Sequence, residues 1–181
     1  MISLKSKITV KILNYFLFNP KKRRYINELA ILLSEDSKNV YRKLQDLEKE
    51  GILKSEFQGK QRYFYLNKVY PLLKEYKAIF FKKVGFEQKL RMVLQNVKGI
   101  NEAYLYGSYA KNKMDSNSDL DLLVIGNHSL LDVQKSIAKI QKEIGREINI
   151  VNLSDEEFKK KKKNNNPFIK NIFSDKIIKL I

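Results

Sequence analysis

Residues 107–124, which read GSYAKNKMDSNSDLDLLV, decide the fold of the second half of the chain. The run before them, residues 101–106, reads as a strand, and a helix is expected to begin after Gly107 and Ser108. Glycine lets a phosphate approach the backbone closely. A serine hydroxyl and the N–H groups at a helix N-terminus can then bind that phosphate. We therefore expect a strand that ends in a phosphate-binding turn.

Two carboxylates follow at the start of the next expected strand, residues 119–125. Asp119 and Asp121 are two residues apart, so their side chains share one face of that strand. Carboxylate oxygens are ligands that suit Mg²⁺, which also takes substrate phosphates, and a two-metal site would activate an attacking hydroxyl and stabilise leaving pyrophosphate. An Asp-x-Asp pair alone is common at solvated strand ends, but the preceding Gly-Ser turn makes the combination far more specific.

This stretch resembles the minimal nucleotidyltransferases of the DNA polymerase beta-like superfamily, whose motif is Gly-Ser, a spacer and Asp-x-Asp. The resemblance covers about residues 98–181, including REINIVNLS at 146–154 and NPFIKNIFSDKIIKLI at 166–181. It implies that Gly107, Ser108 and Lys111 bind a nucleoside triphosphate. It also implies that Asp119 and Asp121 are catalytic residues and ligands of Mg²⁺.

Two positions depart from the pattern of this superfamily. Asn112 replaces a glycine of its usual GSxAxG form. A third carboxylate normally follows on the next strand as Arg-Glu-x-Asp, where this chain has Arg146-Glu147-Ile148-Asn149. Asn149 offers a metal one carbonyl oxygen but no charge and no useful base, which weakens metal ligation and proton transfer together. Glu147 faces the same side of the strand and is a candidate catalytic replacement. Pairing of Glu147 with a nearby Lys or Arg is the alternative.

The first half of the chain reads as short helices followed by a hairpin. Apolar residues recur at helical spacing over 8–17, 26–33 and 40–47, and strand-like runs at 52–57 and 62–66 flank a turn at 58–61. Helix, helix, turn, helix and hairpin is the element order of a winged helix. In such a module the second helix of the helix-turn-helix enters the major groove of DNA, with its early residues facing base edges.

Six side chains are the candidates for DNA contact, from the early face of that helix and from the flanks of the hairpin tip. They are Lys38, Asn39, Arg42, Lys43, Lys60 and Arg62. Lysine and arginine can bond phosphates or guanine, and asparagine can read adenine. The alternatives are an ordinary solvated face on a lysine-rich chain and a winged helix that binds a protein.

This half resembles the winged-helix domains of small bacterial and archaeal transcription regulators of the ArsR-like kind. The resemblance rests on YINELAILLS, SKNVYRKLQDLEKEGIL and GKQRYFYLN, within about residues 8–73. It implies double-stranded DNA as a partner. Winged-helix regulators often form homodimers that read paired half-sites. The expected helix at 71–84 either packs between the domains or forms the dimer seam.

Charge and composition agree with an anionic partner. The chain has 36 Lys and Arg against 20 Asp and Glu, a net charge of +16, which favours nucleic acid. Abundant Lys, Ile and Asn are also typical of an AT-rich genome, so the charge is supporting evidence only. The lysine run at 159–163 is either a solvated face or a contact for nucleic acid or triphosphate.

The absence of cysteine excludes disulfides, thiolate metal sites and a cysteine nucleophile. It also fits a reducing compartment. The chain has no run of 18 apolar residues, and its N-terminus lacks the apolar region of a signal peptide. We therefore expect a cytoplasmic protein with no membrane partner.

The expected architecture is α+β, with a winged-helix DNA-binding domain over 1–70 and linker helices over 71–98. A small nucleotidyltransferase-like α/β domain with a mixed sheet follows over 99–181. The expected function is DNA-binding transcription regulation, with a second domain that either binds Mg²⁺ and a nucleoside triphosphate or serves only as a scaffold. One alternative is an active nucleotidyltransferase that transfers an NMP, such as AMP, to a small molecule or a protein such as a toxin, as antitoxin-type relatives do. Another is a plain protein-interaction module. The sequence leaves open whether the site is active.

Overall fold

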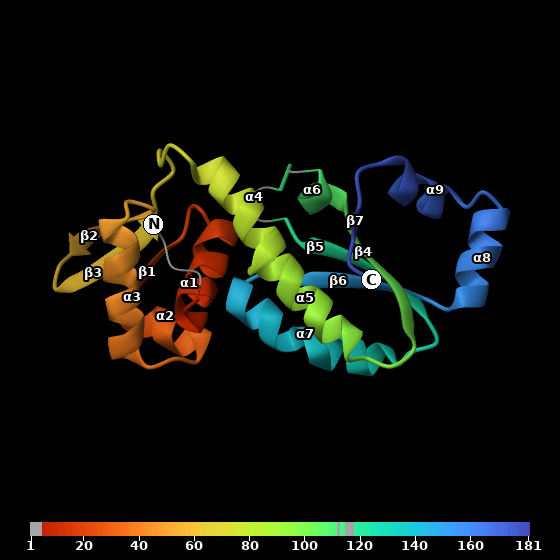
Figure 1. Ribbon diagram of the computed structural model, residues 1–181, viewed down its shortest axis with the longest axis horizontal. Coiled ribbons are helices and arrows are strands. Elements are labelled where there is room, and N and C mark those ends of the chain that lie inside the picture. Colours follow the sequence, from red (N-terminus) through yellow and green to blue (C-terminus); the bar gives the residue numbers. More distant parts are fainter. Residues whose placement is uncertain (1–4, 112, 115–117) are drawn as a thin grey trace. The chain divides into compact units, whose positions relative to one another are not determined.

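The computed structural model describes residues 5–111, 113–114 and 118–181 of the 181-residue chain (Figure 1). The described residues form two compact units. The first contains the residues up to Gln88 together with Lys142–Gly145, and the second contains Lys89–Gln141 and Arg146–Ile181. Each unit combines helices with a β-sheet, which agrees with the α+β class predicted from the sequence.

The first unit contains a three-stranded antiparallel sheet in which β3 lies between β1 and β2. Three helices precede its hairpin, in the order expected from the apolar spacing. The elements are α1 Lys7–Phe18, β1 Arg23–Tyr25, α2 Ile26–Leu33, α3 Ser37–Lys49, β2 Leu53–Gln58 and β3 Gln61–Leu66.

Polar caps mark the beginnings of two of these helices. The Ser6 hydroxyl accepts the Thr9 N–H at 3.3 Å at the start of α1, and an Asp36 carboxylate oxygen accepts the Asn39 N–H at 3.0 Å at the start of α3. The apolar faces of the helices and of β3 form a core in this unit whose members are fully buried: Ile12, Leu13, Phe16, Leu29, Val40, Leu44 and Phe64.

The strand β1 was not predicted from the sequence, which shows only the basic run 21–24 at this point. Charged residues carry little strand signal, but the backbone of β1 pairs with β3, with Arg23 opposite Tyr65. The Arg23 guanidinium lies 5.2 Å from the centre of the Tyr65 ring and also pairs with Glu56. Pairing with a distant strand, rather than local propensity, therefore produces β1.

The segment 71–98, predicted as linker helices, contains α4 Leu73–Lys83 and α5 Phe86–Gln95. The boundary between the two compact units falls after Gln88, inside α5. Gly85 separates the two helices, and a side chain there would contact Phe80 at 2.7 Å, so the packing of the Phe80 ring depends on this glycine.

The second unit is built on a four-stranded sheet with the order β6-β5-β4-β7. The sheet is mixed, as predicted, whereas its strand order was not predicted. β5 runs parallel to β6 and antiparallel to β4, and β4 also pairs with β7 in antiparallel fashion. The elements are β4 Ile100–Tyr106, α6 Gly107–Ala110, β5 Leu120–Gly126, α7 Leu130–Ile144, β6 Ile148–Leu153, α8 Asp155–Lys163, α9 Pro167–Ser174 and β7 Ile178–Lys179.

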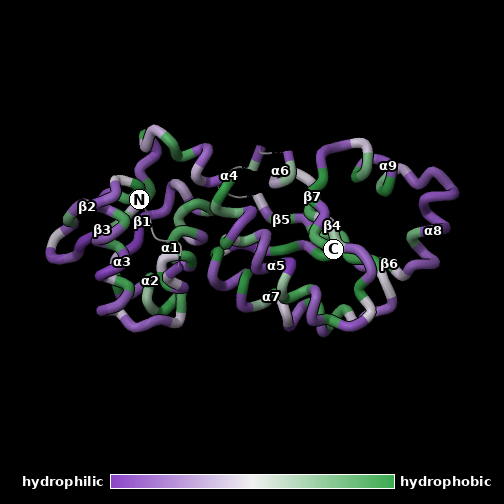
Figure 2. The backbone as a smooth tube through the Cα atoms, viewed as in Figure 1, coloured by the Kyte–Doolittle hydropathy of each residue, from purple (hydrophilic) through white to green (hydrophobic). Residues whose placement is uncertain are grey.

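The central strand β5 is buried on both faces, since Leu122, Leu123 and Val124 are all fully buried. On one face a core forms between the sheet and α9, where Ile169 and Ile172 pack beside apolar residues of β4, β5 and β6. By contrast, α8 is hydrophilic over most of its length (Figure 2). No helix in the described ranges has both the length and the apolar character needed to cross a bilayer.

Candidate nucleotide and metal site

The antiparallel pairing of β4 and β5 brings the two halves of the sequence motif together. Tyr106 at the end of β4 is the register partner of Asp121 at the start of β5. Gly107 follows Tyr106 directly and begins α6, a single helical turn. The glycine turn and the two aspartates, separated in sequence by a spacer, therefore lie at the same end of the sheet.

Gly107 packs directly against the Asp121 carboxylate. Its φ is +70°, in the region that side chains disfavour, and a Cβ there would lie only 2.2 Å from Oδ2 of Asp121. Two features therefore favour glycine at this position: the backbone conformation, and the Asp121 carboxylate, which fills the space that a side chain would need. Ser108 follows and is half-buried, and its carbonyl accepts the Lys113 N–H at 2.9 Å.

Asn149 occupies the neighbouring position on the third strand of the site. The parallel register of β5 and β6 pairs Asp121 with Asn149, and the Asn149 side-chain amide lies 3.5 Å from Oδ2 of Asp119. The structure thus brings Gly107, Asp119, Asp121 and Asn149 together. Glu147 lies before the start of β6 and is exposed, and its backbone carbonyl accepts the Leu120 N–H at 3.0 Å.

Burial of Asp121, together with the nearby charge of Asp119, determines the electrostatics of the site. Burial raises the pKa of Asp121, the Asn149 amide opposes that rise, and the negative charge of Asp119 adds to it. Burial also raises the pKa of Tyr106, with a further contribution from Asp121. Within the described residues, no lysine or arginine forms an ion pair with either aspartate. A bound cation would relieve this repulsion.

The donor set suits Mg²⁺ better than a softer metal. It consists of two carboxylates and one amide oxygen, all hard oxygen donors, and Mg²⁺ usually takes one or two carboxylates together with substrate phosphates. A cluster of three or more His, Cys, Asp or Glu side chains is absent from the parts of the chain that the structure describes. The residues present therefore fit a metal that a nucleotide helps to hold.

Two basic residues lie beside this site. Arg146 is buried and donates to the Ser118 carbonyl at 2.9 Å, which anchors Ser118 two residues before β5. The Lys111 ammonium, expected at the nucleotide, lies 2.6 Å from Asp175. Asn112, the departure from the glycine pattern, lies outside the described residues.

Tyr106 was assigned no role from the sequence. Its hydroxyl-bearing ring is half-buried, and the centre of that ring lies 6.3 Å from the centre of the Phe168 ring of α9. The available signal was its position: it immediately precedes the glycine of the motif, at the end of a strand.

The candidate DNA contacts of the first unit fall into two groups. Lys38, Asn39 and Arg42 on α3 and Lys60 at the hairpin tip are exposed. Lys43 is half-buried and pairs with Asp46 at 2.9 Å on the same helix.

Arg62 is held within the unit by neighbouring side chains. Its guanidinium donates to Glu48 of α3 at 2.7 Å and to the Ser55 hydroxyl of β2 at 2.9 Å, and it lies 5.2 Å from the centre of the Phe64 ring. These contacts tie the hairpin to α3. The sequence gives no direct signal for them, because the three residues come from three different elements.

Comparison with known proteins gives one matching family and several partial structural likenesses, among them the following two. One similar chain comes from a crystal structure of a toxin–antitoxin with AMP-PNP, and its sequence is 23% identical to this chain. The match covers 36% of this chain and 56% of that chain, with a TM-score of 0.33. A protein from Sulfolobus solfataricus assigned as a nucleotidyltransferase is 18% identical, with coverage of 41% and 68% and a TM-score of 0.29. This chain thus spans little more than half of the first structure, and no curated protein matches it.

The family evidence covers the part of the chain that carries the site. The model of the nucleotidyltransferase domain matches residues 87–180, which is more than half of the sequence. That range includes the glycine turn, both aspartates and Asn149. The chain therefore belongs to the nucleotidyltransferase domain family.

Proposed function

We propose that the second unit binds a nucleoside triphosphate together with Mg²⁺. Gly107 and Ser108 would face the phosphates, and Asp119 and Asp121 would hold the metal. The observation that carries this proposal is the strand pairing: β5 lies between β4 and β6, so that Asp121 lies between the glycine turn that follows β4 and Asn149 of β6. Two carboxylates with no cationic partner among the described residues are a poor arrangement for stability and a good one for a divalent cation.

The side chains divide the work of such a site between them. Asp119 and Asp121 supply the negative charge, and the absence of a side chain at Gly107 leaves room for the Asp121 carboxylate. The metal would neutralise charge on the phosphates and on leaving pyrophosphate. Asn149 can orient the Asp119 carboxylate through its amide but cannot accept a proton from an attacking hydroxyl. The arrangement therefore favours nucleotide binding over fast transfer.

We further propose that the first unit binds double-stranded DNA as a winged helix, so that the chain is a transcription regulator with a nucleotide-binding unit. The element order α1-β1-α2-α3-β2-β3 and the exposed cations on α3 support this proposal. Its DNA-binding residues would be Lys38, Asn39, Arg42 and Lys60. The homodimer expected from the sequence stays a prediction. It is supported by Ile79 on α4, a large apolar side chain that is 57% exposed and that a second copy of the chain could cover.

Calorimetric titration tests nucleotide binding without knowledge of any acceptor. The protein is titrated with ATP, GTP, CTP and UTP in the presence of Mg²⁺. We expect binding of at least one nucleotide, lost in Asp119→Ala/Asp121→Ala. A matched variant, Asp132→Ala/Glu156→Ala, removes two exposed acidic residues elsewhere in the unit and is expected to bind normally. Absence of binding by all four nucleotides would overturn the proposal.

A second candidate function is active transfer of an NMP to a protein, such as a toxin, or to a small molecule. The observation in its favour is that Asp121 of the motif packs against Gly107 at one end of the sheet, with Asp119 two residues before it. Labelled-nucleotide transfer tests it: Asp121→Ala should abolish the activity, and Asn149→Asp should raise it by supplying the third carboxylate. A transfer rate that Asp121→Ala leaves unchanged would exclude this site as its source.

A further inference from the structure

A pocket of about 300 Å³ opens between α8 and α9, and neither the glycine turn nor the aspartates line it. Lys161, Lys162 and Lys170 contribute three positive charges, and no acidic side chain lines the pocket. Its apolar wall includes Phe173. The volume is at the lower end of small-molecule sites and suits a ligand of the size of one nucleotide.

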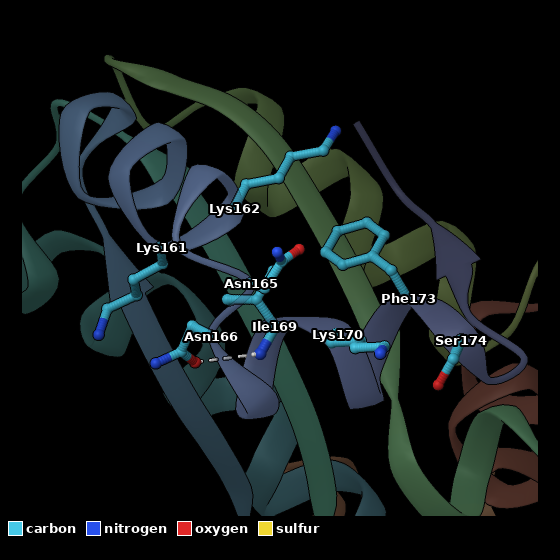
Figure 3. A pocket seen from close by; sticks show the side chains of 8 residues that line it. All are labelled: Lys161, Lys162, Asn165, Asn166, Ile169, Lys170, Phe173 and Ser174. Atoms are coloured by element: carbon cyan, nitrogen blue, oxygen red, sulfur yellow. Dashed lines mark hydrogen bonds between the residues drawn. The ribbon is translucent and has the colours of Figure 1, made fainter.

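Figure 3 shows how the lining side chains lie. The side chains of Lys162 and Asn165 and the ring of Phe173 are directed toward a common space, whereas the chain of Lys161 extends away from Phe173. Asn166 instead serves the backbone: its Oδ1 accepts the Ile169 N–H at 3.3 Å as the cap of α9. The pocket thus combines one aromatic face, one amide and cations at its rim.

The aromatic face is fixed by its neighbours. The centre of the Phe173 ring lies 5.3 Å from that of Tyr104 in an edge-to-face arrangement and 5.7 Å from that of Phe158. Lys162 Nζ lies 6.0 Å from the Phe158 ring centre. Phe173 nevertheless keeps 39% of its surface exposed. A ring held rigidly by packing but open on one side can stack on a base without losing further conformational freedom.

We propose that this pocket binds one nucleotide unit of a single-stranded nucleic acid. The base stacks on Phe173, the Asn165 amide bonds the base edge, and Lys162 and Lys170 contact the flanking phosphates. Stacking combined with a cationic path is the general means by which proteins hold single strands.

The surroundings favour a strand over a free nucleoside triphosphate. Exposed cations continue beyond the pocket along α8 at Lys159, Lys160 and Lys163, which suits a row of phosphates. The lining residues include no carboxylate to hold the metal that accompanies a triphosphate. The assignment does not depend on the proposed Mg²⁺ site, because it uses none of that site's residues.

Fluorescence anisotropy of a labelled single-stranded RNA of about ten nucleotides tests the assignment. The full chain is used, with EDTA present so that metal binding plays no part. Lys162→Gln/Lys170→Gln removes the phosphate contacts. Its control, Lys135→Gln/Lys139→Gln, removes two exposed lysines from α7 and the same charge. Asp119→Ala/Asp121→Ala should bind the RNA as the wild type does, which separates this test from the proposed function.

We expect the Lys162→Gln/Lys170→Gln variant to bind at least about fivefold more weakly than the control, with a salt slope smaller by about 1.4, since each phosphate neutralised contributes about 0.7. Phe173→Leu keeps the apolar packing but removes the stacking face, so it should weaken binding by about fivefold or more with an unchanged slope. Asn165→Gly removes the amide that would bond the base edge. It leaves the core intact, since the φ of +48° at Asn165 suits glycine.

Three outcomes would overturn the assignment. One is that the pocket variants bind the RNA as well as Lys135→Gln/Lys139→Gln does. Another is that free AMP displaces the RNA as effectively as unlabelled RNA does, since the site would then take a mononucleotide. The third is that binding of a polyglutamate peptide depends on Lys162 and Lys170 as RNA binding does, while Phe173→Leu and Asn165→Gly leave the RNA affinity unchanged.

Discussion

The first and second units hold their charged side chains in opposite ways. Between the hairpin and α3, the Arg62 guanidinium lies 2.7 Å from the Glu48 carboxylate and also bonds Ser55, so opposite charges satisfy each other. At the start of β5, Asp119 and Asp121 lie together with an amide as their polar neighbour. The first arrangement stabilises a fold. The second opposes folding and favours a cation, which is the difference between a structural and a binding site.

Among the variants that test this difference, substitution of Gly107 should have the largest effect on ligand binding and stability. In Gly107→Ala the new Cβ would meet the Asp121 carboxylate at 2.2 Å while the backbone keeps a φ of +70°. We expect loss of Mg²⁺–nucleotide binding and destabilisation of more than about 2 kcal/mol, beyond the cost of the left-handed conformation alone. Calorimetry and urea unfolding measure the two effects.

Gly59→Ala is the matched control for this prediction. Gly59 has a φ of +60°, but a Cβ there would have no atom within 4 Å. It should therefore show only the conformational cost of about 1–2 kcal/mol and retain nucleotide binding. Equal effects of the two substitutions would contradict the close packing of Gly107 on Asp121.

Removal of the carboxylate that holds Arg62 should have the next largest effect. Glu48→Gln leaves the Arg62 guanidinium without its charged partner, and the free energy of unfolding should fall by about 2 kcal/mol. On the same helix, Lys43→Gln breaks a surface pair with Asp46 and should cost about 0.5 kcal/mol or less. If both variants unfold alike in urea, the Arg62 contacts contribute no more than an ordinary surface pair.

The pH dependence of stability should reveal the aspartate pair. Because burial raises the pKa of Asp121, the folded chain holds that proton more tightly than the unfolded chain. This contribution is fully present below the ordinary pKa of aspartate and is lost as the pH rises through the raised value. Asp121→Asn should therefore gain stability relative to the wild type between about pH 4 and pH 7, measured in EDTA.

Asp132→Asn, on the exposed surface of α7, serves as the reference for this pH series. A stability difference that changes with pH no more for Asp121→Asn than for Asp132→Asn would contradict the raised pKa of Asp121.

The smallest expected effect concerns the cations of the first unit. Lys38→Gln/Arg42→Gln should weaken binding to duplex DNA and reduce the salt slope by about 0.9 for each phosphate that the protein no longer neutralises. Lys21→Gln/Lys22→Gln, exposed residues before β1, removes the same charge away from α3. If the two double variants bind DNA alike, α3 is not the DNA-contacting helix.

The sequence predicted those elements whose signals are local. The capping pattern around Ser154 and Glu157 marks the start of α8, and the apolar run after Asp121 marks β5. β1 has no such signal, because only its pairing with β3 makes it a strand.

The side-chain partners of the basic residues were beyond the sequence for the same reason. Arg62 of the hairpin pairs with Glu48 of α3, and the Lys111 ammonium lies 2.6 Å from Asp175 in the segment after α9. By contrast, the motif already indicates that Asn149 lies near the aspartates, because it stands where the superfamily has its third carboxylate. In the structure Asn149 is the register partner of Asp121 on the neighbouring parallel strand. Contacts between distant elements require the fold.

Hydrogen exchange tests the central claim, that Asp119 and Asp121 form a cation-dependent nucleotide site, within a single experiment. Exchange is followed in peptides covering β5 and β6 and, as an internal reference, the hairpin β2–β3. We predict that Mg²⁺ with the nucleotide that binds best slows exchange in β5 and β6 of the wild type but not of Asp119→Asn/Asp121→Asn. Without ligand, that variant should exchange more slowly than the wild type in β5, because the repulsion is gone. Equal protection of both proteins by Mg²⁺ and nucleotide, or faster exchange in the variant without ligand, would contradict the account.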